Sequence, residues 1–110
     1  MNVSFDGYLA DSLTFEAADD VAVGLPVAVS DNGKVAKAAD VFCGVCTALK
    51  NGFAAVQLHG YVRLPYTGSM TVGYKLLVAD NGNIKVDADN GREYLVIDVD
   101  ADNHTVGIIL

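Results

Sequence analysis

The chain has 110 residues, which is enough for one domain with its own core but not for two. Hydrophobic residues make up 52% of it and charged residues 19%, and this balance excludes a disordered segment. The net charge is −7 and the seven basic residues are scattered, which argues against binding to nucleic acid. We expect an acidic surface that keeps neighbouring molecules apart or, alternatively, one that docks on a basic patch of a protein partner.

Two further classes of segment are not expected in this sequence. No apolar run reaches the length of about 20 residues that a membrane-spanning helix needs. The first residues, Met1 to Asp6, lack both a basic start and an apolar stretch, so we do not expect a signal peptide.

One stretch of the sequence occurs twice. Residues 24–35 contain an apolar run, an Asp-Asn-Gly turn and a return run, and residues 73–84 repeat this order at an offset of 49 positions. The residues that recur are Val23, Gly24, Val29, Asp31, Asn32 and Gly33, found again as Val72, Gly73, Val78, Asp80, Asn81 and Gly82. We therefore predict two similar β units, about 12–58 and 61–110, related by an approximate twofold axis. Each unit is expected to bury its apolar face against the other.

The chain is expected to begin with an arm, residues 1–11, followed by a single β domain, residues 12–110. The arm carries Phe5, Tyr8 and Leu9, which either pack on their own domain or reach a neighbouring subunit. The first predicted strand, 12–17, alternates so that Leu13 and Phe15 face inward. The residues that follow it, 17–23, are compatible with a short helical turn.

The remaining elements read as short strands separated by turns. Asn32-Gly33 predicts a type I′ hairpin turn, because both residues tolerate a positive φ. Pro65 interrupts strand pairing, so 65–70 is expected to be a loop or an edge. Further strands are expected at 25–30, 34–39, 42–49, 53–58, 60–64, 74–79, 83–88, 94–100 and 104–110. Turns every 8–12 residues or so predict an all-β sandwich or small barrel with little or no helix.

Cys43 and Cys46 form a Cys-x-x-Cys pair, but no helix is expected beside them, as a redox motif would need. On a strand, positions three apart point to opposite faces and lie about 10 Å apart, too far for a disulfide. We expect small buried strand residues. A zinc site would need two more ligands, and His59 and His104 are the candidates for them.

An acidic cluster near the C-terminus raises the possibility of calcium binding. Asp98, Asp100 and Asp102 match the first ligands of an EF-hand loop, but Asn103 replaces the required Gly and Ile109 replaces the final Glu. Asp87, Asp89 and Asn90 belong to the same cluster. We expect exposed turn carboxylates without a metal or any other cofactor.

A catalytic centre is not expected. His59 and His104 have no Ser or Cys arranged beside them as a nucleophile. The hairpin glycines Gly33 and Gly82 are not at a strand-to-helix junction, where they would cradle a phosphate. We therefore predict that the chain is not an enzyme.

Several segments in order resemble the small capsid cement or decoration proteins of tailed bacteriophages, and in particular the group known as DUF2190. They are the Val-x-Val-Gly-x-Pro-Val run before the first turn, Cys43 to Cys46, Val56 to Pro65, Val72 to Val78, and Thr105 to Leu110. The resemblance covers about residues 12–110. It departs after the Leu-Pro pair, where the family often has Lys and this chain has Tyr66.

The resemblance implies a β-barrel-like or β-tulip-like domain that binds the outer surface of an assembled phage head. The implied partner is the major capsid protein, the protein would be a homo-oligomer with a trimer favoured, and its place would be the virion after synthesis in the bacterial host cytoplasm. The residues that we expect to contact a capsid or another subunit are Phe5, Tyr8, Leu9, Pro65, Tyr66 and Met70, with intramolecular packing as the alternative for each. The alternative function is a non-catalytic β module that binds carbohydrate or another surface ligand through its aromatic residues.

Overall fold

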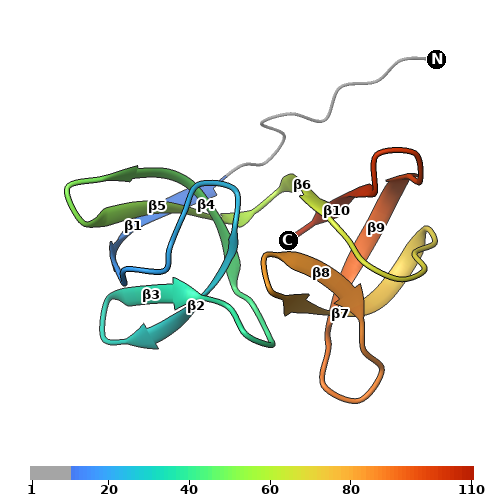
Figure 1. Cartoon of the computed structure of the whole chain (residues 1–110), viewed down its shortest axis with the longest axis horizontal. Helices are drawn as coiled ribbons and strands as arrows, with labels where there is room; N and C mark the ends of the chain where they lie inside the picture. Colours follow the sequence, from blue (N-terminus) through green and yellow to red (C-terminus); the bar gives the residue numbers. More distant parts are fainter. Residues whose placement is uncertain (1–10) are drawn as a thin grey trace.

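A computed structural model describes residues 11–110, which form an all-β protein with no helix in this range (Figure 1). This confirms the predicted fold class. The predicted contact residues Phe5, Tyr8 and Leu9 lie outside the described residues. The strands are β1 (Asp11–Ala17), β2 (Pro26–Asp31), β3 (Lys34–Lys37), β4 (Gly44–Lys50), β5 (Phe53–His59), β6 (Tyr61–Pro65), β7 (Gly73–Asp80), β8 (Asn83–Val86), β9 (Arg92–Asp100) and β10 (Thr105–Ile109).

The first five strands close into a barrel in the order β1-β3-β2-β4-β5. β1 pairs with β5 antiparallel and with β3 in parallel, where Glu16 faces Lys34 and Ala17 faces Val35. The interior is small and aliphatic, as the alternation of small apolar residues along these strands requires. Its buried members are Val21, Val27, Val35, Cys46, Ala54 and Val56.

The last five strands form a second sheet in the order β6-β10-β9-β7-β8. Its two outer strands approach each other, and a single parallel bridge between Tyr66 and Ile84 connects them. This sheet wraps a larger core, in which Leu64, Leu77, Ile84, Tyr94, Val96, Val106 and Ile108 are buried.

The two halves repeat the same strand pairings. β1 relates to β3 and β5 as β6 relates to β8 and β10, and the hairpin pairs recur as well. In the first half the Ala18 N–H donates to the Val35 carbonyl at 2.9 Å, and 49 residues later Thr67 donates to Ile84 at 3.0 Å. The halves do not meet as the predicted twofold axis would require, because the contact between Lys37 and Asn81 is not repeated by the equivalent residues Val86 and Asn32, which are both exposed.

Three local expectations were wrong. The first half encloses an apolar interior of its own, whereas the larger core contains Ala38, Phe42 and Val45 of the first half together with residues of the second, so the halves do not simply close one open face on another. Leu13 is 57% exposed, although Phe15 packs against the core as expected. Residues 18–25 form turns without a helix: the Val21 N–H donates to the Ala18 carbonyl and the Leu25 N–H to the Ala22 carbonyl, each at 3.2 Å.

The hairpin turns also differ from one another. Asn51-Gly52 and Asn81-Gly82 have positive φ at both residues, as a type I′ turn requires. At Asn32-Gly33 only the glycine has a positive φ, of 65°, so the type I′ prediction was wrong there. A bulge between Val29 and Asp31 adds a residue to β2 and changes the twist that the turn must match.

Pro65 explains why only the first half is a closed barrel. In the first half the Glu16 N–H donates to the Gly33 carbonyl at 2.9 Å and helps to join β1 to β3. The residue 49 positions later is Pro65, which has no N–H to donate. The contact between β6 and β8 therefore lacks one of the hydrogen bonds that join β1 to β3. Pro65 lies at the end of β6, as its predicted edge position requires.

Restoring the missing donor is expected to strengthen the contact between β6 and β8. In Pro65→Ala, the Thr67 amide should exchange with solvent a few times more slowly, since one backbone hydrogen bond contributes about 0.5–1.5 kcal/mol. In the unaltered chain, Thr67 should exchange faster than its counterpart Ala18. Amide hydrogen exchange followed by NMR measures both residues in one sample.

The matched control is Glu16→Pro, which removes the equivalent donor from the first half and should lower the protection of Ala18. Global stability is a poor readout here, because replacing proline also raises the entropy of the unfolded chain by a comparable amount. Equal protection of Ala18 and Thr67 in the unaltered chain would contradict the explanation.

The loop between β3 and β4 locks the two halves together. Phe42, 1% exposed, stacks on Tyr94 of β9 with the ring centroids 4.8 Å apart and the planes at 12°. The Tyr94 hydroxyl donates to the Phe42 carbonyl at 2.5 Å, and the Ala79 N–H donates to the Asp40 carbonyl at 2.7 Å. The predicted strand 42–49 was wrong at its start, because β4 begins at Gly44. The Phe42 side chain instead belongs to the core of the second half.

Phe42→Ala is expected to destabilise the protein by about 3–5 kcal/mol, because it empties a fully buried aromatic position. Phe53→Ala is the matched control: Phe53 is 55% exposed, and its loss should change stability by about 0.5 kcal/mol or less. Urea denaturation curves of the two variants measure the difference. Similar losses in both would show that Phe42 does not lock the halves together.

Candidate functional site

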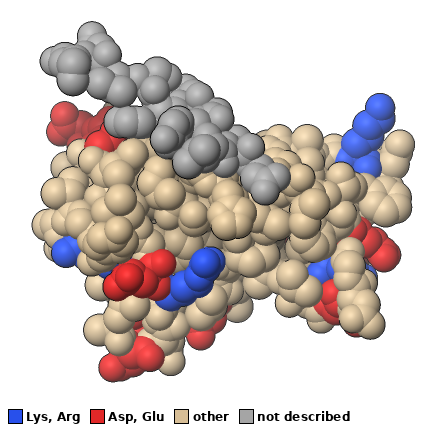
Figure 2. Space-filling model, turned by 180° about the vertical axis from the view of Figure 1, so that it is seen from behind, with Lys and Arg blue, Asp and Glu red and all other residues tan. Residues whose placement is uncertain are grey.

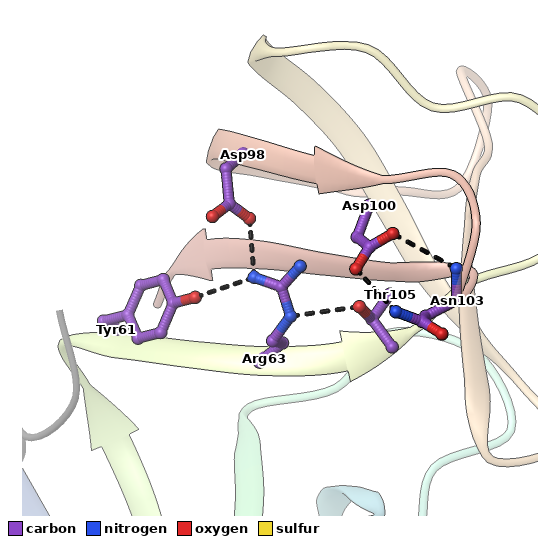
Figure 3. A network of polar contacts seen from close by, with 6 residues as sticks. All are labelled: Tyr61, Arg63, Asp98, Asp100, Asn103 and Thr105. Atoms are coloured by element: carbon purple, nitrogen blue, oxygen red, sulfur yellow. Dashed lines mark hydrogen bonds and ion pairs between the residues drawn. The ribbon is translucent and has the colours of Figure 1, made fainter. Parts of the chain in front are cut away.

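Arg63 is the centre of a polar network on the outer face of the second sheet (Figure 3). Its Nη1 contacts Asp98 Oδ1 at 2.6 Å and donates to the Tyr61 hydroxyl at 3.1 Å. Its Nε donates to Thr105 Oγ1 at 3.0 Å. The register produces this arrangement, because Arg63 of β6 and Asp98 of β9 both pair with Gly107 of β10, the strand between them.

Gly107 makes room for the network. A Cβ at this position would lie 2.6 Å from the Tyr61 hydroxyl oxygen and 3.0 Å from Asp98 Oδ1. Position 107 of β10, which lies between the two charged partners, therefore requires a glycine. The Tyr61 ring occupies the space above it and aligns the guanidinium.

The network holds the Arg63 guanidinium in place and keeps it charged. The hydrogen bond to Tyr61, and after it the contact with Asp98, raise the pKa of Arg63 above its ordinary value, so the side chain stays charged. Both members of the ion pair are partly exposed, with 37% and 47% of their side-chain surfaces accessible. Such pairs contribute little to stability, about 0–1 kcal/mol. The network therefore follows from the alignment of the three strands, which their backbone ladders set.

A groove of about 330 Å³ adjoins this network at the junction of the two halves. Its size is at the lower end of the range for small-molecule sites, about 300–1,000 Å³. Its lining comes from β4, β5 and β6 and from the turn before β2. The lining residues are Val23, Gly24, Val45, Cys46, Thr47, Gln57, Tyr61, Val62 and Arg63.

The polar groups of the groove are paired within the protein. The Gln57 amide donates to the carbonyls of His59 and Tyr61, both at 2.9 Å. The Thr47 hydroxyl donates to the Ala55 carbonyl at 3.3 Å. Among the residues that the structure describes, no buried side-chain nitrogen or oxygen lacks a partner. The groove therefore offers an apolar wall and fixed dipoles more than a set of reactive groups.

The two cysteines are free, and burial raises the pKa of each thiol. Thiols in this state are protonated near neutral pH, which makes them weak nucleophiles and weak metal ligands. Cys46 is buried in β4, as expected, but Cys43 is half-buried and precedes that strand, so the expectation of a buried strand residue was wrong for it. His104 occupies a turn with φ of 53°, and its ring lies 5.5 Å from that of Tyr66. Within residues 11–110, no three His, Cys, Asp or Glu side chains are placed to hold a metal.

The acidic turns have partners of their own. Asp100 accepts hydrogen bonds from the side chain of Asn103 at 2.8 Å and from its N–H at 3.2 Å (Figure 3). Asp87 accepts the N–H groups of Asp89 and Asn90. Asp98 is committed to Arg63. Asp87 and Asp100 therefore stabilise turns, as expected, whereas Asp98 lies within β9 and the expectation of a turn carboxylate was wrong for it.

The predicted contact residues fall into different environments. Pro65 is exposed at the end of β6. Tyr66 and Met70 are buried in the second core, at 6% and 9% exposure, so the intramolecular alternative describes both. We did not predict the Arg63 network or the groove, since they join strands that are distant in the sequence. The one local signal was Gly107 inside an apolar strand, which indicates a close approach of another group.

The surface charge is mixed. Figure 2 shows one face on which acidic side chains and a few basic ones lie mainly toward the ends and the lower edge, separated by uncharged surface. No helix in the described range is long and apolar enough to span a membrane.

Comparisons of the chain with protein-family models, with curated proteins and with solved structures find no match.

The turn at 100–103 is expected to loosen in acid. The Asn103 side chain and N–H lower the pKa of Asp100 below its ordinary value of 3.8. A carboxylate with a lowered pKa stabilises the folded state above that ordinary value, and the contribution is lost as the pH falls through the lower, folded-state pKa. The Asn103 amide resonance should therefore shift below about pH 3.8. NMR titration measures it, and in Asp100→Ala the acid-induced shift should disappear.

Proposed function

We propose that the chain is a non-catalytic structural protein that binds the outer surface of an assembled tailed-phage head and stabilises it. One observation carries the proposal. The polar groups of the Arg63 network and the groove are paired with one another, while large apolar side chains are exposed on a scaffold whose halves are locked together. Exposed apolar surface marks sites of protein contact more often than sites of chemistry.

The exposed apolar residues give the proposal its contact surface. They occur in both halves and are Leu13, Val23, Val29, Val41, Leu49, Phe53, Val72, Tyr74 and Val86. Of the contact residues expected from the sequence, Pro65 stays a candidate on the described surface, and Phe5, Tyr8 and Leu9 stay candidates outside it. The implied partner is the major capsid protein, in the virion.

The physical reason for such a protein is linkage. A ligand that binds only the assembled shell stabilises that shell by mass action, without reacting with it. Contacts repeated over the shell need not be strong individually if the protein is oligomeric. A locked β scaffold suits this role because little conformational freedom is lost on docking.

Co-sedimentation tests the proposal. Purified protein is mixed at micromolar concentration with phage heads that lack decoration and the heads are pelleted. We expect the protein in the pellet with assembled heads and in the supernatant with unassembled capsid subunits. Phe53→Ser, which alters an exposed aromatic residue of the first half, shows whether that half docks. Absence from the pellet in all cases, or binding on a glycan array in its place, would contradict the proposal.

A further inference from the structure

The junction between the halves contains a contact that bears on self-association. The β7–β8 turn of the second half lies against the first half, where Lys37 Nζ donates to Asn81 Oδ1 at 2.9 Å. On the same turn, a Cβ at Gly82 would lie 3.2 Å from Leu25 Cδ2. Leu25 and Lys37 thus form a receiving surface for a hairpin tip.

The second half carries the same receiving positions, and there they are uncovered. At the 49-residue offset, Leu25 corresponds to Tyr74 and Lys37 to Val86. Tyr74 is 68% exposed and Val86 45% exposed, and Val72, which precedes Tyr74 by two residues, is 61% exposed. Val86 is more suited to apolar contact than its counterpart, since a valine replaces a lysine, and Tyr74 presents an aromatic ring where the first half has a leucine.

The complementary tip is also present and exposed. Asn32 and Gly33 in the β2–β3 turn correspond to Asn81 and Gly82, and both are exposed, as is Val29 beside them. Figure 1 shows the tips of both hairpins directed toward the same end of the molecule. The β2–β3 tip lies at the left end of the long axis, and the chain enters β7 near the right end. The β2–β3 tip and the start of β7 therefore lie toward opposite ends of the molecule (Figure 1).

We propose that Val72, Tyr74 and Val86 form a docking surface for the β2–β3 hairpin of a second copy of this chain, in a head-to-tail contact. A second copy is the occupant because the chain supplies the matching tip and shows, at its own junction, how tip and surface fit. Such a contact joins two different faces, so it is heterologous and builds rings or open chains. The inference goes beyond the proposed function, since it needs no capsid.

The contact between copies is weaker than the internal junction. The counterpart of Phe42 is Gly91, so the second half has no aromatic side chain with which to repeat the stacking on Tyr94. Each copy also carries a net charge of −7, and like charges repel when two copies approach. Association should therefore increase with salt, as screening shortens the range of the repulsion.

Sedimentation velocity of the full chain over a concentration series tests the association. We expect reversible oligomers that become more populated at higher salt, and a loss of about tenfold or more in the association constant for Tyr74→Ser. Phe53→Ser is the matched control, since it removes a similarly exposed aromatic residue away from the proposed surface and should leave association unchanged. A monomer at all concentrations and salts, or equal effects of the two variants, would overturn the proposal.

Cross-linking tests the direction of the contact. Val86→Cys and Asn32→Cys are made in separate samples of Cys43→Ser protein, mixed, and treated with a short bis-maleimide, because Lys37 spans the equivalent internal gap with a long side chain. We expect cross-linked pairs in this mixture only. Cross-linking in the Val86→Cys sample alone, or equal yields when Lys50→Cys replaces Asn32→Cys, would overturn the head-to-tail geometry. These readouts involve no phage head, so their failure is distinguishable from failure of the proposed function.

Discussion

The contact between Phe42 and Tyr94 joins the two halves of the molecule through a shared core. The strands of the two sheets are ordered separately, so the strand pairing alone does not set the angle between the halves. The loop between β3 and β4 does so by placing one aromatic ring of the first half inside the core of the second. Burial raises the pKa of the Tyr94 phenol and keeps it protonated, so the hydroxyl remains a donor to the Phe42 carbonyl. The groove lies at the junction of the halves, so its shape depends on the angle that this contact sets.

Much of the fold could be predicted from the sequence. Alternating apolar residues and Asn-Gly turns predicted the strands, because these are local features that strand geometry imposes directly. The recurrence at 49 residues predicted two similar β units, and the strand pairings recur at that spacing. What failed was the packing between the units. Phe42 looked like the start of a strand, and only the tertiary structure shows that its ring belongs to the other half. Leu13 alternates correctly but lies where no neighbour in the described chain covers it well.

The candidate site could not be predicted in the same way. Arg63, Asp98 and Thr105 come from three strands, and their proximity depends on registers that no local pattern encodes. Tyr66 and Met70 show the opposite difficulty, since large apolar residues suit a partner as well as a core, and here the core takes them. The structure turns attention from those two residues to the exposed aromatic side chains Phe53 and Tyr74.

Pro65 has a consequence for where the folded chain opens first. The first half is a closed barrel, whereas in the second a bridge between Tyr66 and Ile84 joins the outer strands β6 and β8. Local opening of the second half is therefore expected to begin between β6 and β8, while β10 stays paired with β6 on one side and with β9 on the other. A single missing backbone N–H, that of Pro65, thus makes the second half the first to open locally, although the two halves have similar strand pairings.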